Sequence, residues 1–260
     1  NKDHPFFCYL PTNAPHGPFR VPNSYSELYR GQVPDSRANF YGMITNIDEN
    51  MARLRTRLKN LGIEDNTILI FMTDNGSAAG CELDRDQYVL DGFNAGMRGM
   101  KGSAYEGGHR VPFFMYWPDA GFTEGRDVDQ LAANIDLLPT LIELCQLQVA
   151  EDCQFHGISL VPLFHGETGE WPDRVVVTDS QRVEHPIKWK QSATMTQRWR
   201  LINGVELYDI LFDPEQRDDV SIDQPDLVDQ LREHYERWWE LVSPRFDEDC
   251  PIIIGSQNEK

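Results

Sequence analysis

The chain has few basic residues and no long hydrophobic run. Its 260 residues include 24 lysines and arginines against 42 aspartates and glutamates, which gives a formal net charge of −18. Unassisted nucleic-acid binding depends on a basic surface, so this balance argues against a nucleic-acid partner. No apolar run approaches the roughly 18–20 residues of a membrane span, so the sequence predicts no spanning helix. The acid excess also disfavours a bare anionic substrate, and any anion site must be a local positive island.

Cysteine is scarce as well. The chain has five cysteines, so at least one is unpaired within it. Cys145 and Cys153 flank a short loop and could form a bridge in an oxidising compartment, but buried free thiols are an equal alternative. We therefore assign no disulfide. The hydrophobic content of 40% with 11% aromatics is that of an ordinary globular protein, and the length suits one large or two modest domains.

A buried strand ending in polar residues is the most informative segment. The apolar run 68–72 has no polar alternation, which is typical of a strand covered on both faces. It ends in Asp74-Asn75-Gly76, and oxygen donors beyond the carboxyl end of a strand in an α/β sheet are well placed for a hard cation. A capped turn explains the same residues. Asn75 also begins the only N-glycosylation sequon in the chain, and of the two incompatible roles we favour metal ligand over glycan site.

Several motifs follow one another along the chain. They are Ala-Pro-His at 14–16, Thr-Asp-Asn-Gly at 73–76, and Lys-Gly with Glu-Gly-Gly-x-Arg-Val-Pro at 101–102 and 106–112. In this order and spacing the chain resembles the sulfatase family of the alkaline phosphatase superfamily. Segments 134–141 and 206–214 also look like sulfatase segments, so the resemblance runs nearly end to end.

The resemblance implies a fold and a set of site residues. The fold is an alkaline-phosphatase-like α/β arrangement, with a mostly parallel sheet flanked by helices. Asp74 and Asn75 match the family's calcium ligands, and Lys101 matches the lysine that binds sulfate. His16 matches the histidine that contacts the sulfate or the leaving group.

One departure from the family concerns the nucleophile. Sulfatases carry Cys-x-Pro-x-Arg, whose cysteine is oxidised to formylglycine, and no cysteine of this chain lies in that motif. The family's first pair of calcium-binding aspartates is missing too. Asp74 and Asn75 supply two or three oxygens, whereas calcium takes six to eight. We therefore expect a C-terminal portion of a longer sulfatase, inactive by itself, with the nucleophile and further calcium ligands in a missing N-terminal part.

Other polar residues have weaker assignments. Glu106 and Arg110 are predicted to brace the turn that presents Lys101. His185 is a candidate substrate-binding residue, in a polar cluster after a strand. Its neighbours Arg182 and Lys188 could touch a sugar and Trp189 could stack on one, although an ordinary solvated loop explains the cluster too.

The pattern of elements predicts two parts. We expect a strand at 5–11, a long amphipathic helix capped by Asp35-Ser36 and ended by Gly62, and a glycine-rich active-site loop over 76–110. Helix followed by strand is the crossover of a parallel sheet. A second helix is predicted from 134 to about 144. After about residue 170 the texture changes to short strands at 174–180, 192–202 and 206–210 and a helix at 224–241. We place the catalytic α/β part at 1–170 and a small antiparallel sheet with a helix at 171–260.

These features predict a calcium-dependent hydrolase of sulfate monoesters, and a sulfated carbohydrate is the favoured substrate. A phosphonate or phosphate ester hydrolase of the same superfamily is an alternative, since a metal, a lysine and a histidine suit either anion. A catalytically inactive carbohydrate-binding fragment is another. The compartment stays open, although many of the family are exported.

Overall fold

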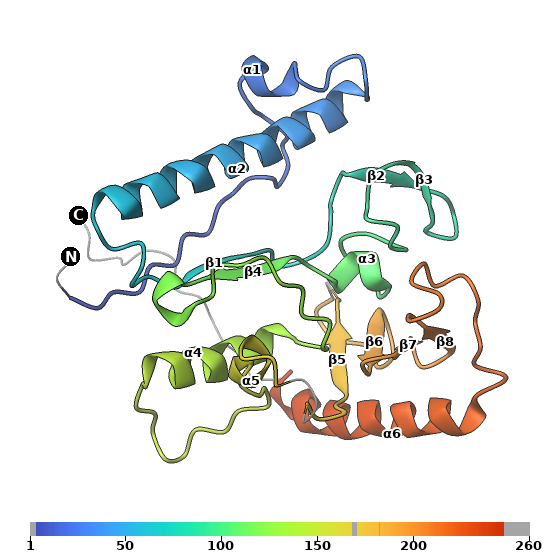
Figure 1. Cartoon of the computed structure of the whole chain (residues 1–260). Helices are drawn as coiled ribbons and strands as arrows, with labels where there is room; N and C mark the ends of the chain where they lie inside the picture. The colour runs from blue at the N-terminus through green and yellow to red at the C-terminus, as the bar shows by residue number, and fades with distance from the viewer. Residues whose placement is uncertain (1–3, 168–170, 182, 247–260) are drawn as a thin grey trace, which may run out of the picture.

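The computed structural model describes residues 4–167, 171–181 and 183–246 (Figure 1). Residues 4–22 carry no regular secondary structure. The strand predicted at 5–11 is therefore wrong: the segment is extended, but no described strand pairs with it. Its aromatic residues lie open to solvent, with Phe7 83% exposed. An extended segment becomes a strand only through a hydrogen-bonded partner, which an apolar sequence alone does not supply.

A short helix, α1 (Asn23–Ser26), leads to the long helix α2 (Asp35–Asn60). The predicted side-chain cap is absent, because Pro34 occupies the N-cap position and makes no side-chain hydrogen bond. The predicted end is confirmed. Gly62 has a φ of +68°, and the amides of Gly62 and Ile63 bond back to the carbonyls of Lys59 and Leu58. This pairing satisfies the last carbonyls of the helix, and glycine adopts the left-handed conformation without a Cβ penalty.

The strand after this helix is β1 (Leu69–Met72), which pairs with β4 (Phe113–Tyr116) in a two-stranded sheet. The pairing is antiparallel, with Leu69 opposite Tyr116 and Met72 opposite Phe113. The parallel crossover predicted from helix and strand is thus not formed, and every strand pair in the described ranges is antiparallel. An apolar run signals burial but not strand direction, which depends on how the chain returns.

The connection from β1 to β4 holds a hairpin, β2 (Cys81–Leu83) with β3 (Val89–Gly92), and a single turn of helix, α3 (Glu106–His109). Arg37 of α2 is buried and fixes the hairpin, since its guanidinium bonds Asp91 at 2.6 Å and Glu82 at 3.0 Å. The glycine-rich loop is therefore ordered and folded upon itself.

After β4 come two short 3-10 helices at Pro118–Ala120 and Asn134–Asp136, then α4 (Leu137–Cys145) and α5 (Val161–Phe164). The helix predicted from 134 to about 144 is confirmed. Asp136 is fully buried and holds this corner together, because its carboxylate accepts the amides of Ala133 and Ile158 and pairs with Arg174 at 2.8 Å.

The C-terminal part is a four-stranded antiparallel sheet covered by a helix, as predicted. The strands are β5 (Val176–Asp179), β6 (Ser192–Met195), β7 (Trp199–Ile202) and β8 (Glu206–Asp209), in that order across the sheet. The helix is α6 (Pro225–Val242), followed by a 3-10 turn at Ser243–Arg245. The domain boundary near residue 170 stays a prediction.

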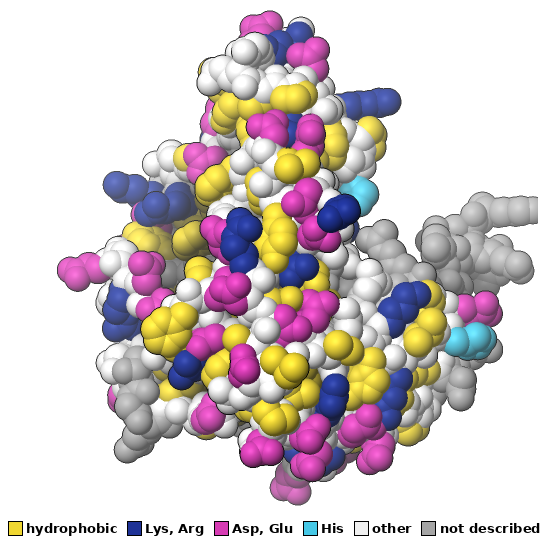
Figure 2. All heavy atoms as spheres, turned by 90° about the vertical axis from the view of Figure 1, so that its right-hand side faces the viewer, with side chains coloured by type: hydrophobic (Ala, Val, Ile, Leu, Met, Phe, Trp, Pro, Cys, Tyr) yellow, Lys and Arg dark blue, Asp and Glu magenta, His cyan; other side chains and the backbone are white. Residues whose placement is uncertain are grey.

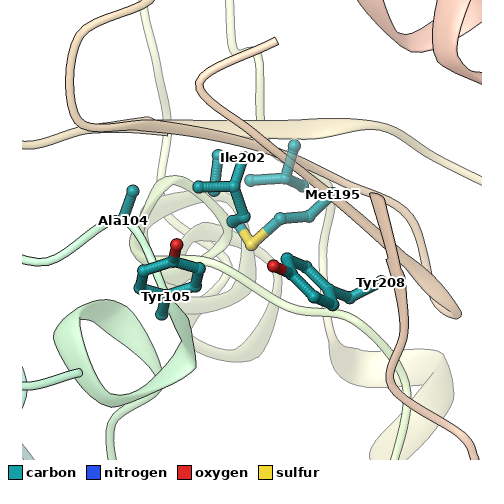
Figure 3. Packing of buried hydrophobic residues seen from close by; sticks show 7 residues of the cluster. Ala104, Tyr105, Met195, Ile202 and Tyr208 are labelled. Atoms are coloured by element: carbon teal, nitrogen blue, oxygen red, sulfur yellow. The ribbon is translucent and has the colours of Figure 1, made fainter. Parts of the chain in front are cut away.

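Both faces of this sheet are buried. One face packs on the chain just before α3, where Ala104 and Tyr105 meet Met195, Ile202 and Tyr208 (Figure 3). The opposite face packs on α6 through four buried residues: Leu201, Leu207, Val228 and Leu231. The segment carrying Lys101 therefore leads directly into the core of the C-terminal sheet.

Two surface properties match the composition. No helix in the described part of the chain is long and apolar enough to cross a membrane. Figure 2 shows acidic, basic and hydrophobic side chains interspersed over the face that carries β8 and α6, with no broad basic area on that face.

Candidate active site

Two polar residues stand just beyond the end of β1. Asp74 is exposed and Asn75 is half-buried. Their side chains make no hydrogen bond or ion pair with any described residue; only the main-chain oxygen of Asn75 accepts a bond, from the Thr73 hydroxyl at 3.3 Å. An unpaired carboxylate and amide at a strand end are free to bind a ligand.

Three glycines lock this loop against the turn formed by α3. The amide of Gly76 donates to the carbonyl oxygen of Gly108 at 3.0 Å. A Cβ on Gly76 would lie 1.8 Å from the Gly107 oxygen, one on Gly107 would lie 2.2 Å from the Gly99 oxygen, and one on Gly108 would lie 2.0 Å from the Ser103 oxygen. Only glycine permits such close backbone approach, which gives the Glu-Gly-Gly motif its physical reason.

The backbone of Lys101 is bonded to the loop that follows β1. Its amide donates to the carbonyl oxygen of Ser77 at 2.9 Å, two residues beyond Asn75. The turn that carries it needs Gly99 at φ +79° and Gly102 at φ +86°. The Lys101 side chain is half-buried and has no described partner. The structure therefore brings the backbone of Lys101 and the Asp74-Asn75 loop together and leaves their charged groups unpaired.

His16 lies on the irregular segment that precedes α1. It is exposed, and its Nδ1 lies 2.8 Å from the oxygen of Gly17. The loop beyond it packs on α2 through Phe19 and Phe40, whose ring centroids are 5.5 Å apart. Next to Phe40, Tyr41 donates its hydroxyl to the oxygen of Gly80 in the glycine-rich loop at 2.8 Å. His16 thus lies on a loop that approaches the site by way of α2, and no described contact joins it to Lys101.

His185 lies on the loop between β5 and β6. This side chain is exposed, and the loop is closed by Gln181, whose amide makes two 2.8 Å hydrogen bonds with the backbone of Ile187. At the end of the loop, Gln191 Nε2 donates to the oxygen of Gly102 at 2.9 Å. The loop is therefore fastened to the residue that follows Lys101. Sequence reasoning missed Gln191, because a polar residue on an exposed loop carries no signal of a partner 89 residues away.

The neighbours of His185 are engaged with the protein. Lys188 forms an ion pair with Glu236 of α6. Trp189 stacks on Tyr235 with ring centroids 3.8 Å apart, and a Cβ on Gly204 would come within 2.6 Å of its ring. The suggestion that Trp189 stacks on a sugar is therefore wrong: its ring packs inside the C-terminal part. Arg182 lies outside the described residues.

Glu106 is the most buried charged residue near the site, at 1% exposure. The predicted pair with Arg110 exists at 3.5 Å, but Arg110 is exposed and the closer partner is Arg200 of β7, whose Nε donates at 2.6 Å. Burial opposes ionisation of Glu106, and Arg200, His109 and Arg110 together outweigh it, so the pKa of this carboxyl is lowered.

The donors present fit part of a calcium shell. Asp74 and Asn75 offer carboxylate and amide oxygens, which calcium prefers, but calcium takes six to eight oxygens. No group of three or more His, Cys, Asp and Glu side chains able to hold a metal ion occurs within the described ranges. The two residues are therefore a partial ligand set.

The fold is of the alkaline-phosphatase-like α/β class, as comparisons with solved structures show. The structure aligns with the phosphonate monoester hydrolase of Agrobacterium radiobacter at a TM-score of 0.54 and 24% identity, over 81% of this chain and 42% of that chain, which supports the fold alone. The family model for sulfatases matches residues 1–147, and the model for the C-terminal region of N-sulphoglucosamine sulphohydrolase matches residues 100–240. The chain belongs to the sulfatase family.

Two relatives show how much of a sulfatase the chain represents. It is 32% identical over 167 residues to the uncharacterized sulfatase YdeN of Escherichia coli K12, covering 62% of this chain and 27% of YdeN. The crystal structure of Ps i-CgsB in complex with k-i-k-neocarrahexaose aligns at a TM-score of 0.80 and 27% identity, covering 94% of this chain and 52% of that chain. The chain thus spans about a quarter to a half of the length of these relatives.

Proposed function

We propose that the protein acts as a hydrolase of sulfate monoesters, and that the loops of Asp74-Asn75 and Lys101 form one wall of its active site. The observation that carries this proposal is the bond from the Lys101 amide to Ser77, which joins two loops whose charged side chains have no partner among the described residues. In a chain with net charge −18, a lysine that has no described partner and lies beside the proposed cation-binding loop provides a local positive charge suited to an anion.

Each residue has a distinct proposed role. Lys101 binds a sulfate oxygen and stabilises the charge that grows there in the transition state. Asp74 and Asn75 hold part of the coordination shell of a calcium ion, which when bound polarises the sulfate. His16 holds the proton for the leaving oxygen. The nucleophile, a formylglycine, is proposed to lie outside these 260 residues, since no cysteine here stands in its motif.

A sulfated carbohydrate is the proposed substrate class. The complex of Ps i-CgsB contains an oligosaccharide, and the present chain aligns with that structure over 94% of its length. The loop of His185 supports the proposal, because Gln191 fastens it beside Gly102 and so places a polar loop next to the lysine. We assign His185 to the part of the site that contacts the sugar.

The test measures, with the full-length protein, the turnover of different esters and the binding of a sulfated oligosaccharide. Turnover of an aryl sulfate and of a sulfated oligosaccharide, but not of the matching aryl phosphate, is expected, with loss of turnover after calcium chelation. Preference for the phosphate or phosphonate ester would favour the alternative hydrolase. Binding of the oligosaccharide without turnover of any ester would favour an inactive carbohydrate-binding protein.

Two variants refine the test. Asp74→Ala is expected to weaken calcium binding, measured directly by titration calorimetry rather than through activity. His185→Ala is expected to raise KM for the oligosaccharide severalfold and to leave the aryl sulfate unchanged, because the aryl ester has no sugar to contact. An equal effect on both substrates would remove His185 from the sugar site.

A further inference from the structure

A buried ion pair connects the C-terminal sheet to the α3 turn, which lies beside the candidate site. Arg200 of β7 and Glu106 of α3 are 94 residues apart in sequence, and their side chains are 7% and 2% exposed. The guanidinium also donates from Nη1 to the main-chain oxygens of Thr196 and Trp199. A charged pair so far from solvent holds its partners in one geometry, because either charge left alone would be strongly unfavourable.

Gln216, in the segment after β8, holds the same residue from another direction. Its Oε1 accepts the main-chain amide of Glu106 at 2.8 Å, and the residue is fully buried. Its own main-chain oxygen accepts the hydroxyl of Tyr88 at 2.9 Å and Nη1 of Arg98 at 3.0 Å. Glu106 is thus held by its carboxylate and by its backbone, both from C-terminal residues.

The residues that follow Glu106 set the spacing of the site. Gly107 donates its amide to the oxygen of Arg98 at 2.8 Å, at the start of the turn that carries Lys101. Gly108 accepts the amide of Gly76, next to Asn75. A shift of Glu106 therefore moves both the lysine and the metal-ligand loop.

We propose that Arg200 and Gln216 are positioning residues for the candidate site: by holding Glu106, they fix the turn that sets Lys101 against Asp74 and Asn75. The proposal rests on the proposed function and adds to it that the C-terminal sheet controls the geometry of the reacting groups. Transition-state stabilisation needs donors placed to within a fraction of an ångström, so a small displacement of the turn lowers turnover more than it lowers substrate binding.

Two conservative variants test the proposal. Arg200→Lys keeps the positive charge, so Glu106 is not left unpaired, but removes the planar fork that bonds Glu106, Thr196 and Trp199 together. Gln216→Asn shortens the side chain by one carbon and breaks the bond to the Glu106 amide. Gln216 has a φ of +54°, a conformation that asparagine adopts more readily than most residues, so the backbone is preserved.

The matched control is Arg198→Lys. Arg198 lies two residues from Arg200 and pairs with Asp209 through three bonds of 2.5–2.9 Å, but it is 44% exposed and contacts no residue of the α3 turn. The control therefore removes a guanidinium that forms an ion pair within the same sheet but makes no contact with the α3 turn.

Kinetics of the full-length protein on an aryl sulfate give the first measurement. Arg200→Lys and Gln216→Asn are each expected to lower kcat about tenfold or more, with KM within about twofold, while Arg198→Lys keeps both constants. Unchanged kcat in both variants would overturn the proposal, and so would an equal loss in the control.

Hydrogen exchange gives a measurement that does not need activity. The amides of Gly76 and Lys101 are expected to exchange faster in both variants, with exchange in β5–β8 unchanged. Faster exchange spread evenly over the sheet, with a lower Tm, would show a structural role only and would also overturn the proposal. If the wild-type protein hydrolyses no sulfate ester, the proposed function fails, and local exchange alone decides whether Arg200 and Gln216 position the loops.

Discussion

The two sheets that end near the site differ in burial. In the C-terminal sheet Leu201, Ile202 and Leu207 are completely buried, whereas in the β1–β4 sheet Phe114 is 65% exposed and Met72 is 36% exposed. The first sheet is enclosed by α6 and by the chain before α3, and the second has open apolar faces in the described chain. The best-packed core and the candidate active-site residues therefore lie in different regions of the molecule. Glu106 connects the two regions.

The largest effect is expected from a variant that removes Glu106, the residue that connects the two regions. Glu106→Ala leaves the Arg200 guanidinium buried without its carboxylate, which is expected to cost about 3–5 kcal/mol of unfolding free energy. Denaturant unfolding followed by fluorescence measures it. The control, Asp209→Ala, removes the partner of the part-exposed Arg198 and is expected to cost much less, because solvent screens this pair. Similar losses in the two variants would mean that the buried pair contributes no more to the free energy of unfolding than the part-exposed pair does.

The next effect contrasts the two sheets directly. Leu201→Ala removes a fully buried side chain between β7 and α6 and is expected to cost about 2–5 kcal/mol. Phe114→Ala in β4 removes a side chain that is mostly in water and is expected to cost well under half as much, because little apolar area returns to solvent. Equal losses would show that the face of β4 is covered in solution.

Lys101→Ala should separate chemistry from stability. Loss of the contact to the sulfate is expected to raise the activation free energy by about 2–4 kcal/mol, or roughly 10²–10³-fold in rate. The unfolding free energy should hardly change, because the side chain has no partner among the described residues. Steady-state kinetics of the full-length protein, with thermal unfolding of the same preparation, test both halves; turnover near the wild-type value would remove Lys101 from the site.

Sequence reasoning was most successful where local chemistry decides the structure. The end of α2 followed from Gly62, whose left-handed conformation closes a helix in most contexts. The antiparallel C-terminal sheet was predicted from short β-rich segments that follow one another after about residue 170. The motif around Lys101 was recognised from its glycines, and the structure supplies the reason, since Gly107 and Gly108 meet backbone atoms at distances that no Cβ tolerates.

Long-range partners could not be read from the sequence. Arg200 lies 94 residues from Glu106, and the local sequence around either residue does not predict that the two pair. The nearer arginine, Arg110, was predicted to pair with Glu106 and brace the turn of Lys101, but at 3.5 Å it is a weaker partner than Arg200 at 2.6 Å. The strand predicted at 5–11 and the parallel crossover predicted after α2 are not formed in the described chain for the same reason: strand pairing depends on elements distant in sequence.

The smallest expected effect concerns His109, which lies between the two regions. Burial is the main cause that lowers its pKa; Arg200 and Arg110 lower it further, Glu106 opposes them, and its Nε2 lies 3.1 Å from the oxygen of Ala104. Below about pH 6.5 the unfolded chain binds a proton that the folded protein excludes, so stability falls with falling pH by up to about 1.4 kcal/mol per unit until the folded group also titrates. The lowered pKa of Glu106 acts in the same direction, but its contribution to stability begins to be lost only below about pH 4.5, whereas that of His109 begins to be lost below about pH 6.5.

His109→Gln removes the ionisable group and keeps an amide that can donate to Ala104. Unfolding free energy measured by denaturant between pH 7 and pH 5 should then fall less steeply than in the wild type. The control is His156→Gln, at an exposed histidine, which is expected to keep the wild-type slope. If His109→Gln keeps that slope as well, His109 takes up its proton equally in the folded and unfolded states, and the turn between the two regions is open to water.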